Sequence, residues 1–420
     1  MIGRPLKVFL LIVPAIAWLI LALIIGIGRE HIDMSALFIA GYLVNNGSPD
    51  LIYTVGERVF GPTPQLWQEA LVNSGYESLR FVAYLYPPVW AWIVAPLAQL
   101  PLQTFYNATL LFQCATMLGA VVLAWHLAPR GTLAGWAWSM IAFILLSTTI
   151  FGLSAIKLNQ LQITVTFLIV WSMVSAQRGQ EGRAGALLAL AVALKVTPLF
   201  FVLVLIGARQ WRACLWFAIV GGGLGLASLA IAGWPLHWQF LQRLSMLNDL
   251  TAISAINHSL EPLLMELHLW LSGLPIPDTR LGFVYTMAEP VWVQLATKSV
   301  LLLGILALFR TQKSIPARFL GFAILTSLAG PFAWAHYYLV PVMALPALFH
   351  IMPRWTAGLW ILMIGTACNF FVYMAIHAYN HIFVATAVVT VITFGALFIA
   401  ILLSKTNPPP LATPATASDS

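Results

Sequence analysis

Charged residues are scarce in this sequence, at 8% of 420 residues, whereas 61% of the residues are hydrophobic. No soluble core of this size could bury so much apolar surface, so the composition excludes a soluble globular protein and predicts an all-α polytopic membrane protein. The net charge is +7, but the basic residues lie scattered at the ends of apolar runs, where they set membrane topology. We therefore expect membrane lipid as a partner and no nucleic acid.

Metal-ligand and disulfide patterns are also missing. The three cysteines, Cys114, Cys214 and Cys368, each lie inside an apolar run without a partner at a useful spacing, so we expect them to be packing residues. The histidines likewise show no metal-ligand spacing. The sequence therefore predicts no protein-built metal site and no cofactor.

One short stretch, Arg29-Glu30-His31-Ile32-Asp33, concentrates the charge that the rest of the chain lacks, and it follows an apolar run long enough to cross a bilayer. Charge at mid-membrane costs roughly 2.5–3.5 kcal/mol per residue on insertion scales, so this cluster marks a membrane–water boundary. Asp33 then begins a helix that we expect to lie along the membrane surface. The apolar stripe of this helix comprises Met34, Leu37, Phe38, Gly41 and Tyr42. Asp33 is here either a catalytic general base or the N-cap of the helix.

Two long polar regions, at about 29–85 and 233–289, interrupt the apolar runs, and we expect both to be external loops. The runs predict 11 to 13 membrane segments in a single domain over residues 1–405, followed by a disordered Pro/Ala/Ser/Thr-rich tail at 406–420. With both polar regions outside, most clusters of basic residues face the cytoplasm. The segment Pro87–Pro101 either crosses the membrane or is re-entrant, and the distribution of positive charge favours the second alternative.

Two polar breaks in the apolar runs could carry chemistry. Lys195-Val196-Thr197-Pro198 predicts two half-helices or one kinked helix, and its lone cation either pairs with a lipid phosphate or snorkels at a helix end. Asn159 and Gln160 lie in a polar patch between two further runs. They either hydrogen-bond a sugar or phosphate oxygens, or belong to an ordinary short loop.

Two later motifs add further candidates. His336 and Tyr337 lie among aromatic residues at a membrane boundary, where a histidine can donate to a leaving phosphate or relay a proton, but where aromatic belts also form without any function. Asn257-His258-Ser259 has the letters of a glycosylation acceptor, a weak pattern. Its place in the second polar region makes substrate contact by Asn257 and His258 the better interpretation.

The order and spacing of these motifs resemble glycosyltransferase family 87, a family of bacterial α-mannosyltransferase-like membrane enzymes with the GT-C fold. The segments that carry the resemblance are Asp33 with the later Gly47 and Tyr53, Tyr86-Pro87-Pro88, Pro96 to Pro101, Asn159 to Gln162, Ala193 to Pro198, Asn257 to Leu260, and Gly330 to Tyr338. Two departures are present, because Gly330 stands where the family has Ser and Tyr337 stands where it has a second His. The polar patch at Asn159 also matches its family motif imperfectly.

The resemblance implies inverting transfer of a sugar, with mannose expected, from a polyprenyl-phosphate donor to a glycolipid or glycan acceptor. Asp33 would be the general base, and Lys195, assisted by His336 or Arg80, would stabilise the leaving phosphate. A monophosphate leaving group carries less charge than a nucleotide diphosphate, which agrees with the lack of an Asp-x-Asp metal motif. The implied location is the bacterial inner membrane, with the active site on the periplasmic or extracellular side.

A transporter or a flippase for lipid-linked glycans would share the polytopic pattern and the broken helix. A transporter is disfavoured because the sequence shows no convincing pair of related halves. A flippase is disfavoured because such proteins usually lack a long first loop headed by a lone carboxylate.

Overall fold

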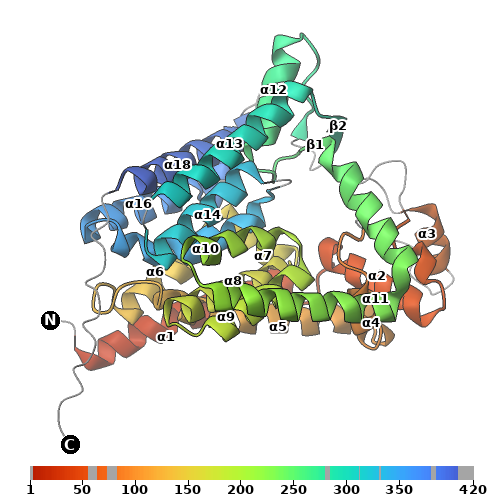
Figure 1. The fold of residues 1–420 in the computed structure, drawn as a ribbon, viewed down its shortest axis with the longest axis horizontal. Coiled ribbons are helices and arrows are strands. Elements are labelled where there is room, and N and C mark those ends of the chain that lie inside the picture. Colours follow the sequence, from red (N-terminus) through yellow and green to blue (C-terminus); the bar gives the residue numbers. More distant parts are fainter. Residues whose placement is uncertain are drawn as a thin grey trace, which may run out of the picture.

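The computed structural model describes residues 3–54, 64–72, 83–279, 284–311, 313–330, 333–379 and 385–404. These residues form helices with one small antiparallel sheet, so the predicted all-α class is confirmed (Figure 1). The first helices are α1 (Arg4–Gly26), α2 (Ile32–Asn45), α3 (Gln65–Val72), α4 (Val89–Val94), α5 (Leu102–Trp125), α6 (Gly135–Thr148), α7 (Ile150–Lys157), α8 (Gln162–Gln177), α9 (Glu181–Leu194), α10 (Val202–Gly207) and α11 (Trp211–Asn248). The later elements are β1 (Leu250–Ile253), α12 (Leu260–Leu271), β2 (Tyr285–Ala288), α13 (Val291–Arg310), α14 (Ile315–Ala329), α15 (Leu339–Ala344), α16 (Arg354–Ala367), α17 (Phe370–Tyr379) and α18 (Ala385–Leu403).

Four of the described helices, α1, α5, α11 and α13, are long and apolar enough to cross a membrane. Six further apolar helical stretches have 10–17 residues each. An α-helix needs about 20 residues to span the hydrocarbon core, so helix length alone identifies only the first group. The predicted number of 11 to 13 membrane segments therefore stays a prediction.

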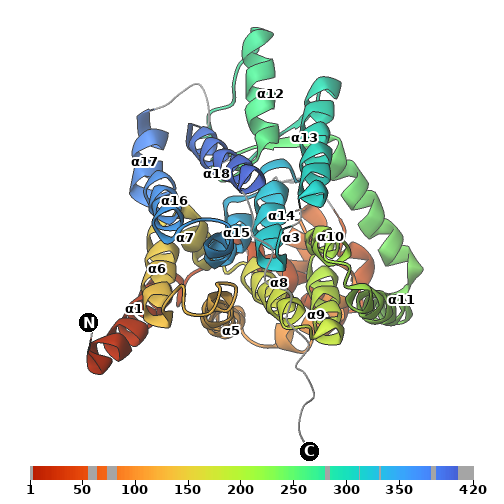
Figure 2. The same cartoon turned by 60° about the vertical axis from the view of Figure 1, so that its left-hand side comes forward.

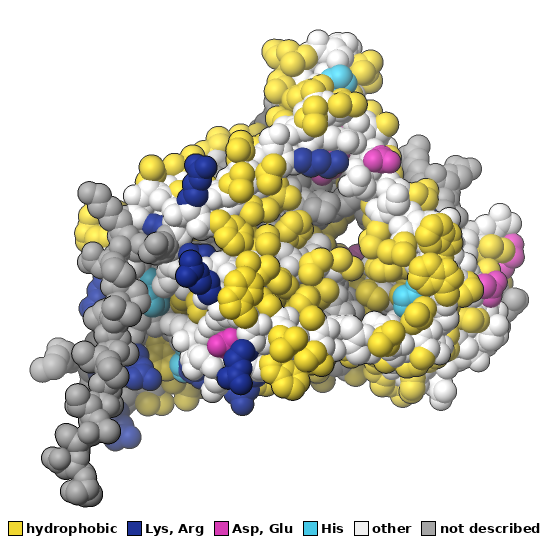
Figure 3. Space-filling view, in the orientation of Figure 1, with side chains coloured by type: hydrophobic (Ala, Val, Ile, Leu, Met, Phe, Trp, Pro, Cys, Tyr) yellow, Lys and Arg dark blue, Asp and Glu magenta, His cyan; other side chains and the backbone are white. Residues whose placement is uncertain are grey.

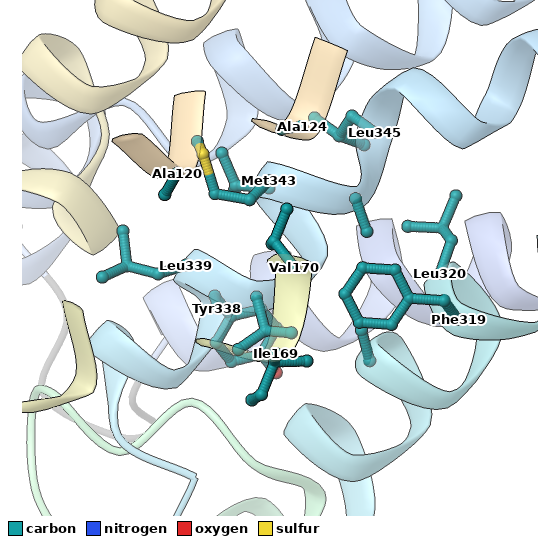
Figure 4. Packing of buried hydrophobic residues seen from close by; sticks show 14 of the residues in the cluster. Ala120, Ala124, Ile169, Val170, Phe319, Leu320, Tyr338, Leu339, Met343 and Leu345 are labelled. Atoms are coloured by element: carbon teal, nitrogen blue, oxygen red, sulfur yellow. The ribbon is translucent and has the colours of Figure 1, made fainter. Parts of the chain in front are cut away.

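The helices pack as two groups that share one core. In the first group α5, α8, α9 and α11 follow one another across the molecule, each packed on the next (Figure 2). The second group contains α13, α14, α16 and α18, and α14 and α15 join it to α8. Figure 4 shows the buried contact between the groups, where Val170 of α8, Phe319 of α14 and Met343 of α15 meet. Buried Cys114 and Cys368 belong to the same core and Cys214 packs against it, as expected of packing residues.

The helix that carries Asp33 is buried on almost every side, so the single apolar stripe expected for it is wrong. Its expected position along the membrane surface stays a prediction. In α2 every residue from Met34 to Gly41 is buried, and so is Leu43. The reason is that α4 and the 3₁₀ helix η2 (Leu97–Gln99) fold back over it. Gly41 permits this approach, because a Cβ atom there would lie 3.0 Å from the backbone nitrogen of Ala95.

The segment Pro87–Pro101 does not form a spanning helix. It contains α4, with six residues, and η2, with three. Six helical residues reach about 9 Å at 1.5 Å per residue, against a hydrocarbon core of about 30 Å. The structure therefore favours the re-entrant alternative.

The second polar region is largely regular structure rather than an open loop. After a break at Gly233, where φ is 75°, α11 continues to Asn248. Leu236 and Phe240 of this continuation pack with Tyr53, which follows α2, and Arg243 donates a hydrogen bond to the Tyr53 carbonyl oxygen. β1 then pairs with β2, and α12 projects from the body at the top of Figure 1. The tail at 406–420 and Arg80 lie outside the described residues.

Candidate functional site

A cavity of about 650 Å³ lies where α2, the break between α9 and α10, the end of α11 and the 3₁₀ helix η5 (Ala335–Tyr338) meet. We call it the central cavity. It brings together five of the predicted site residues: Asp33, Gln160, Lys195, His336 and Tyr337. These residues come from four distant parts of the chain, so their convergence is a property of the fold and not of any one motif.

Asp33 occupies the second position of α2 and not its N-cap. The N-cap is His31, whose ring nitrogens lie 3.0 Å from the Lys157 carbonyl oxygen and 3.1 Å from that of Gly26. These contacts fix the start of α2 against the end of α7. The N-cap alternative for Asp33 is therefore wrong, and the Asp33 carboxylate is free to face the cavity and accept a hydrogen bond from Gln160 Nε2.

The charge state of Asp33 depends on two opposing effects. Burial disfavours the carboxylate and raises the pKa of Asp33 to about 6, while the positive charge of Lys195 acts in the opposite direction. A carboxyl group with this pKa is mostly ionised at neutral pH and close to the range in which a general base is effective. The role of Asp33 as a general base stays a prediction.

Gln160 is directed at Asp33 by a tight turn between α7 and α8. Asn159 has the left-handed φ of 51°, and its Nδ2 donates to the Tyr106 carbonyl oxygen at 3.1 Å and to Thr109 Oγ1 at 2.9 Å. The Gln160 backbone nitrogen donates to the Ala155 carbonyl oxygen at 2.9 Å. Asn159 thus anchors the turn, as the loop alternative predicts, and Gln160 lines the cavity. Contact between Gln160 and a substrate stays a prediction.

Lys195 lies at the predicted break, which consists of two half-helices. α9 ends at Leu194, Lys195 is extended (φ −155°, ψ 131°), and the 3₁₀ helix η3 (Thr197–Phe201) leads into α10. Trp90 Nε1 fixes the end of α9 by donating to the Ala193 carbonyl oxygen at 2.5 Å. Lys195 Nζ lies 4.1 Å from the centre of the Tyr337 ring, so the ammonium group is held in the cavity and does not snorkel away from it.

His336 offers a neutral imidazole to the same cavity. Its side chain is 3% exposed, and its Nδ1 has no hydrogen-bond partner among the described residues. Burial and then the charge of Lys195 hold the pKa of His336 well below its ordinary value. The η5 segment is fixed by a hydrogen bond of 2.7 Å from the Ala335 nitrogen to the Ile256 carbonyl oxygen. An orphan ring nitrogen next to a cation is a suitable contact for a phosphate oxygen or a sugar hydroxyl.

Asn257 and His258 do not line the central cavity. Asn257 Nδ2 donates to the Ala252 carbonyl oxygen at 2.7 Å, and its Oδ1 accepts from Ser259. His258 Nδ1 lies 2.8 Å from Thr390 Oγ1, and its ring stacks on Tyr373. These contacts hold the segment that supports η5, and the predicted substrate contact by these two residues gains no support from their placement. Arg80 cannot be placed, because it lies outside the described residues.

The apolar wall of the central cavity was missed by the sequence reasoning. Leu199 and Leu203 line it from the half-helix after Lys195, and Leu244 and Leu247 line it from the end of α11. The helical spacing of the two α11 leucines could have revealed that the helix continues past Gly233. Among the described residues, no group of three or more His, Cys, Asp or Glu side chains is arranged to hold a metal ion.

Comparison with known proteins identifies the family to which the chain belongs. The model of glycosyltransferase family 87 matches residues 84–334, more than half of the chain. The chain belongs to this family. Its matched range includes Gln160 and Lys195, while Asp33 precedes it and His336 follows it.

Among solved structures, this family 87 chain is similar to ArnT from Cupriavidus metallidurans bound to undecaprenyl phosphate. The two are 11% identical, the comparison covers 95% of this chain and 77% of that chain, and the TM-score is 0.36. A search of curated protein sequences gave no match.

Proposed function

We propose that this family 87 protein transfers a sugar, mannose by resemblance, from a polyprenyl-phosphate donor to a glycolipid or glycan acceptor, with inversion. The observation that supports the proposal is the central cavity, where the Asp33 carboxylate and the Lys195 ammonium group lie against one apolar wall. A base, a cation and an apolar surface are the three features that such a reaction requires. The reaction takes place on the non-cytoplasmic face of a bacterial inner membrane.

The proposed reaction is a single displacement. Asp33 takes the proton of an acceptor hydroxyl, and the acceptor oxygen attacks the anomeric carbon from the side opposite the phosphate. The bond between that carbon and the phosphate oxygen breaks, and the polyprenyl phosphate leaves with the electron pair. Lys195 balances the charge that develops on the phosphate, and His336 donates a hydrogen bond from its neutral ring. One displacement inverts the configuration at the anomeric carbon.

The apolar wall supports a lipid-linked donor. Val196 and Leu199 line the cavity and remain 39% and 48% exposed, and both belong to the break that also supplies Lys195. A phosphate that contacts Lys195 therefore has apolar surface beside it for the attached isoprenoid chain. Burial of that chain contributes about 0.8 kcal/mol per CH₂ group, enough to dominate donor binding.

We further propose that transfer is independent of metal ions. Lys195 Nζ lies over the Tyr337 ring, and its positive charge would stabilise the negative charge of a leaving monophosphate. A divalent metal ion has this role when the leaving group is a nucleotide diphosphate. Within the described part of the chain, the cavity lining offers one carboxylate, Asp33, and one imidazole, His336, which is fewer ligands than a structural or catalytic metal site normally has. Transfer should therefore continue in excess EDTA.

The proposal is tested by incubating detergent-purified protein with radiolabelled polyprenyl-phosphate sugars and a host membrane lipid extract. Asp33→Asn keeps the size of the side chain but removes the base, so we expect transfer to fall by about 10²–10⁴-fold. Asp50→Asn is the matched control, because Asp50 is exposed, lies in the turn just after α2 and does not line the cavity. Transfer by Asp33→Asn at the wild-type rate would contradict the assignment of the base.

A related measurement separates transfer from transport. In proteoliposomes, a transferase converts the lipid-linked donor into free polyprenyl phosphate and a glycosylated product. Time-dependent accumulation of intact donor or sugar, with no change in the lipid-linked sugar, would instead indicate a transporter or flippase.

A further inference from the structure

A second cavity, of about 700 Å³, lies at the far end of α8 from the Gln160 turn. We call it the basic end cavity. The 16 residues of α8 separate the two cavities by about 24 Å at 1.5 Å per residue. The second cavity is therefore distinct from the proposed transfer site, and it lies at the end of the molecule that the positive charges assign to the cytoplasm.

The lining of the basic end cavity is cationic. Arg130, from the turn after α5, and Arg178, at the end of α8, both line it, and His126 lies beside them. No Asp or Glu lines this cavity within the described part of the chain. Both arginines are exposed and both line the same cavity, so a single ligand there can contact both.

The walls of the cavity are fixed before any ligand binds. Trp125 Nε1 donates to the Leu133 carbonyl oxygen at 2.8 Å, and Arg354 Nη2 donates to the Gly131 carbonyl oxygen at 3.0 Å. Each cavity arginine precedes a glycine with left-handed backbone, with φ of 76° at Gly131 and 71° at Gly179. These sharp turns fix the backbone that carries Arg130 and Arg178 at the same cavity.

The cavity also contains an unsatisfied acceptor. Gln177 lines it, and the buried Oε1 of Gln177 has no hydrogen-bond partner among the described residues. A buried polar atom without a partner costs free energy that a donor from a ligand or water would recover. This oxygen has almost no accessible surface, so the two arginines, and not Gln177, carry the recognition of an anion in the cavity.

We propose that the basic end cavity binds the phosphate group of a phosphate ester, with Arg130 and Arg178 on the phosphate oxygens. Guanidinium groups pair with phosphate through two parallel hydrogen bonds. A basic pocket between membrane helices on the cytoplasmic side suits the headgroup of an anionic lipid. The same chemistry is present in a soluble glycerol phosphate. This site is independent of the transfer reaction.

The experiment uses the purified full chain and two probes, phosphatidylglycerol in phosphatidylcholine nanodiscs and soluble sn-glycerol 3-phosphate. Lipid binding is measured by native mass spectrometry and glycerol phosphate binding by calorimetry. We expect the double variant Arg130→Gln/Arg178→Gln to weaken binding by about tenfold or more for whichever of the two probes the wild-type protein binds. The reason is that hydrogen bonds to charged groups are lost. The matched control is Arg183→Gln/Arg212→Gln, which removes two exposed arginines from the same end that do not line the cavity.

The two arms distinguish the sources of the phosphate. Selective loss of phosphatidylglycerol binding identifies a lipid headgroup, and selective loss of glycerol 3-phosphate binding identifies a soluble ligand. Equal binding by the two double variants in both arms would overturn the proposal.

The wild-type protein provides a check that does not depend on folding of a variant. Bound ligand should protect Arg130 and Arg178, but not Arg183, from phenylglyoxal, as read by peptide mass spectrometry. Equal modification of all three arginines with and without each probe would also overturn the proposal.

Discussion

The ionisation of Asp33 gives the reaction a defined pH dependence. Burial raises the pKa of Asp33 to about 6, so the carboxylate needed as a base is present above this pH and is lost as the pH falls through it. One unit below the pKa only about a tenth of the carboxyl groups are ionised, so kcat/KM at pH 5 should be about tenfold below the value for full ionisation. Burial also lowers the pKa of Lys195 to about 7, so the rate should fall again as the pH rises through 7 and Lys195 loses its charge. The measurement is donor turnover from pH 4.5 to 8.5. A rate independent of pH from 5 to 7 would contradict the assignment.

Replacement of Lys195 should change both the pKa of Asp33 and the stabilisation of the leaving phosphate. Its positive charge lowers the pKa of Asp33, so Lys195→Met should raise that pKa further and move the acid limb to higher pH. The same substitution removes the cation nearest the leaving phosphate, so we also expect a fall in kcat of about 10²-fold. Lys298→Met, which removes an exposed lysine on α13, is the control and should leave the pH profile in place. If kcat falls but the acid limb does not move, Lys195 stabilises the leaving phosphate but does not set the pKa of Asp33.

At the scale of the helices, the position of Asp33 depends on close packing of α2 against α4. A Cβ atom at Gly41 would lie 3.0 Å from the Ala95 nitrogen and from the Ala98 Cβ, both of which are held by the fold. We expect Gly41→Ala to destabilise the protein by about 1–3 kcal/mol and to lower kcat, because relief of the overlap moves α2. Thermal unfolding in detergent and turnover check both effects.

Gly225→Ala provides the control for this prediction. Gly225 lies in α11, and nothing lies within 4 Å of a Cβ atom built there. Alanine is the better helix former by about 1 kcal/mol, so the control should be neutral or slightly more stable. If both variants behave alike, the contact between α2 and α4 does not set the position of Asp33.

The elements differ in how far the sequence predicts them. The break at Lys195 was predictable, because a proline and a lone cation interrupt an apolar run and both act locally. The burial of α2 was not predictable, because it depends on contact with α4, which lies some 50 residues later in the chain. Nothing in the local sequence of α4 determines which helix it packs against. The hydrogen bond from Gln160 to Asp33 joins residues 127 positions apart. No spacing rule along the chain could predict that contact.

Local patterns also misjudged some motifs. Asn257 and His258 combine polar letters with a place in a polar region, which suggested substrate contact, yet both are buried and hydrogen-bonded within the protein. Their polar groups stabilise a loop whose backbone pairs with Trp334, directly before η5. Polar residues in a membrane protein therefore mark either a site or the support of a site, and only the fold distinguishes them.

At the scale of the whole molecule, the face drawn in Figure 3 shows charge separated along the direction of the long helices. The Lys and Arg side chains of one face lie mainly at the end that holds the N-terminus, and the acidic side chains lie mostly toward the other end and the top (Figure 3). Between them the surface is largely apolar, with Trp216, Ile219 and Leu226 of α11 each more than 45% exposed. From this distribution we expect the basic end to face the cytoplasm and the central cavity to open toward the opposite side of the membrane.

This orientation can be tested with single cysteines in a chain whose three native cysteines are replaced. Asp50 is exposed close to α2, and Arg183 is exposed near the start of α9, beside the basic end cavity. In intact cells stripped of their outer membrane, a membrane-impermeant maleimide should label Asp50→Cys and should label Arg183→Cys only after permeabilisation. The physical reason is that basic residues near the ends of membrane segments are retained on the cytoplasmic side. The reverse labelling pattern would place Asp33 on the cytoplasmic side, and the donor sugar would then have to be presented from the inner leaflet.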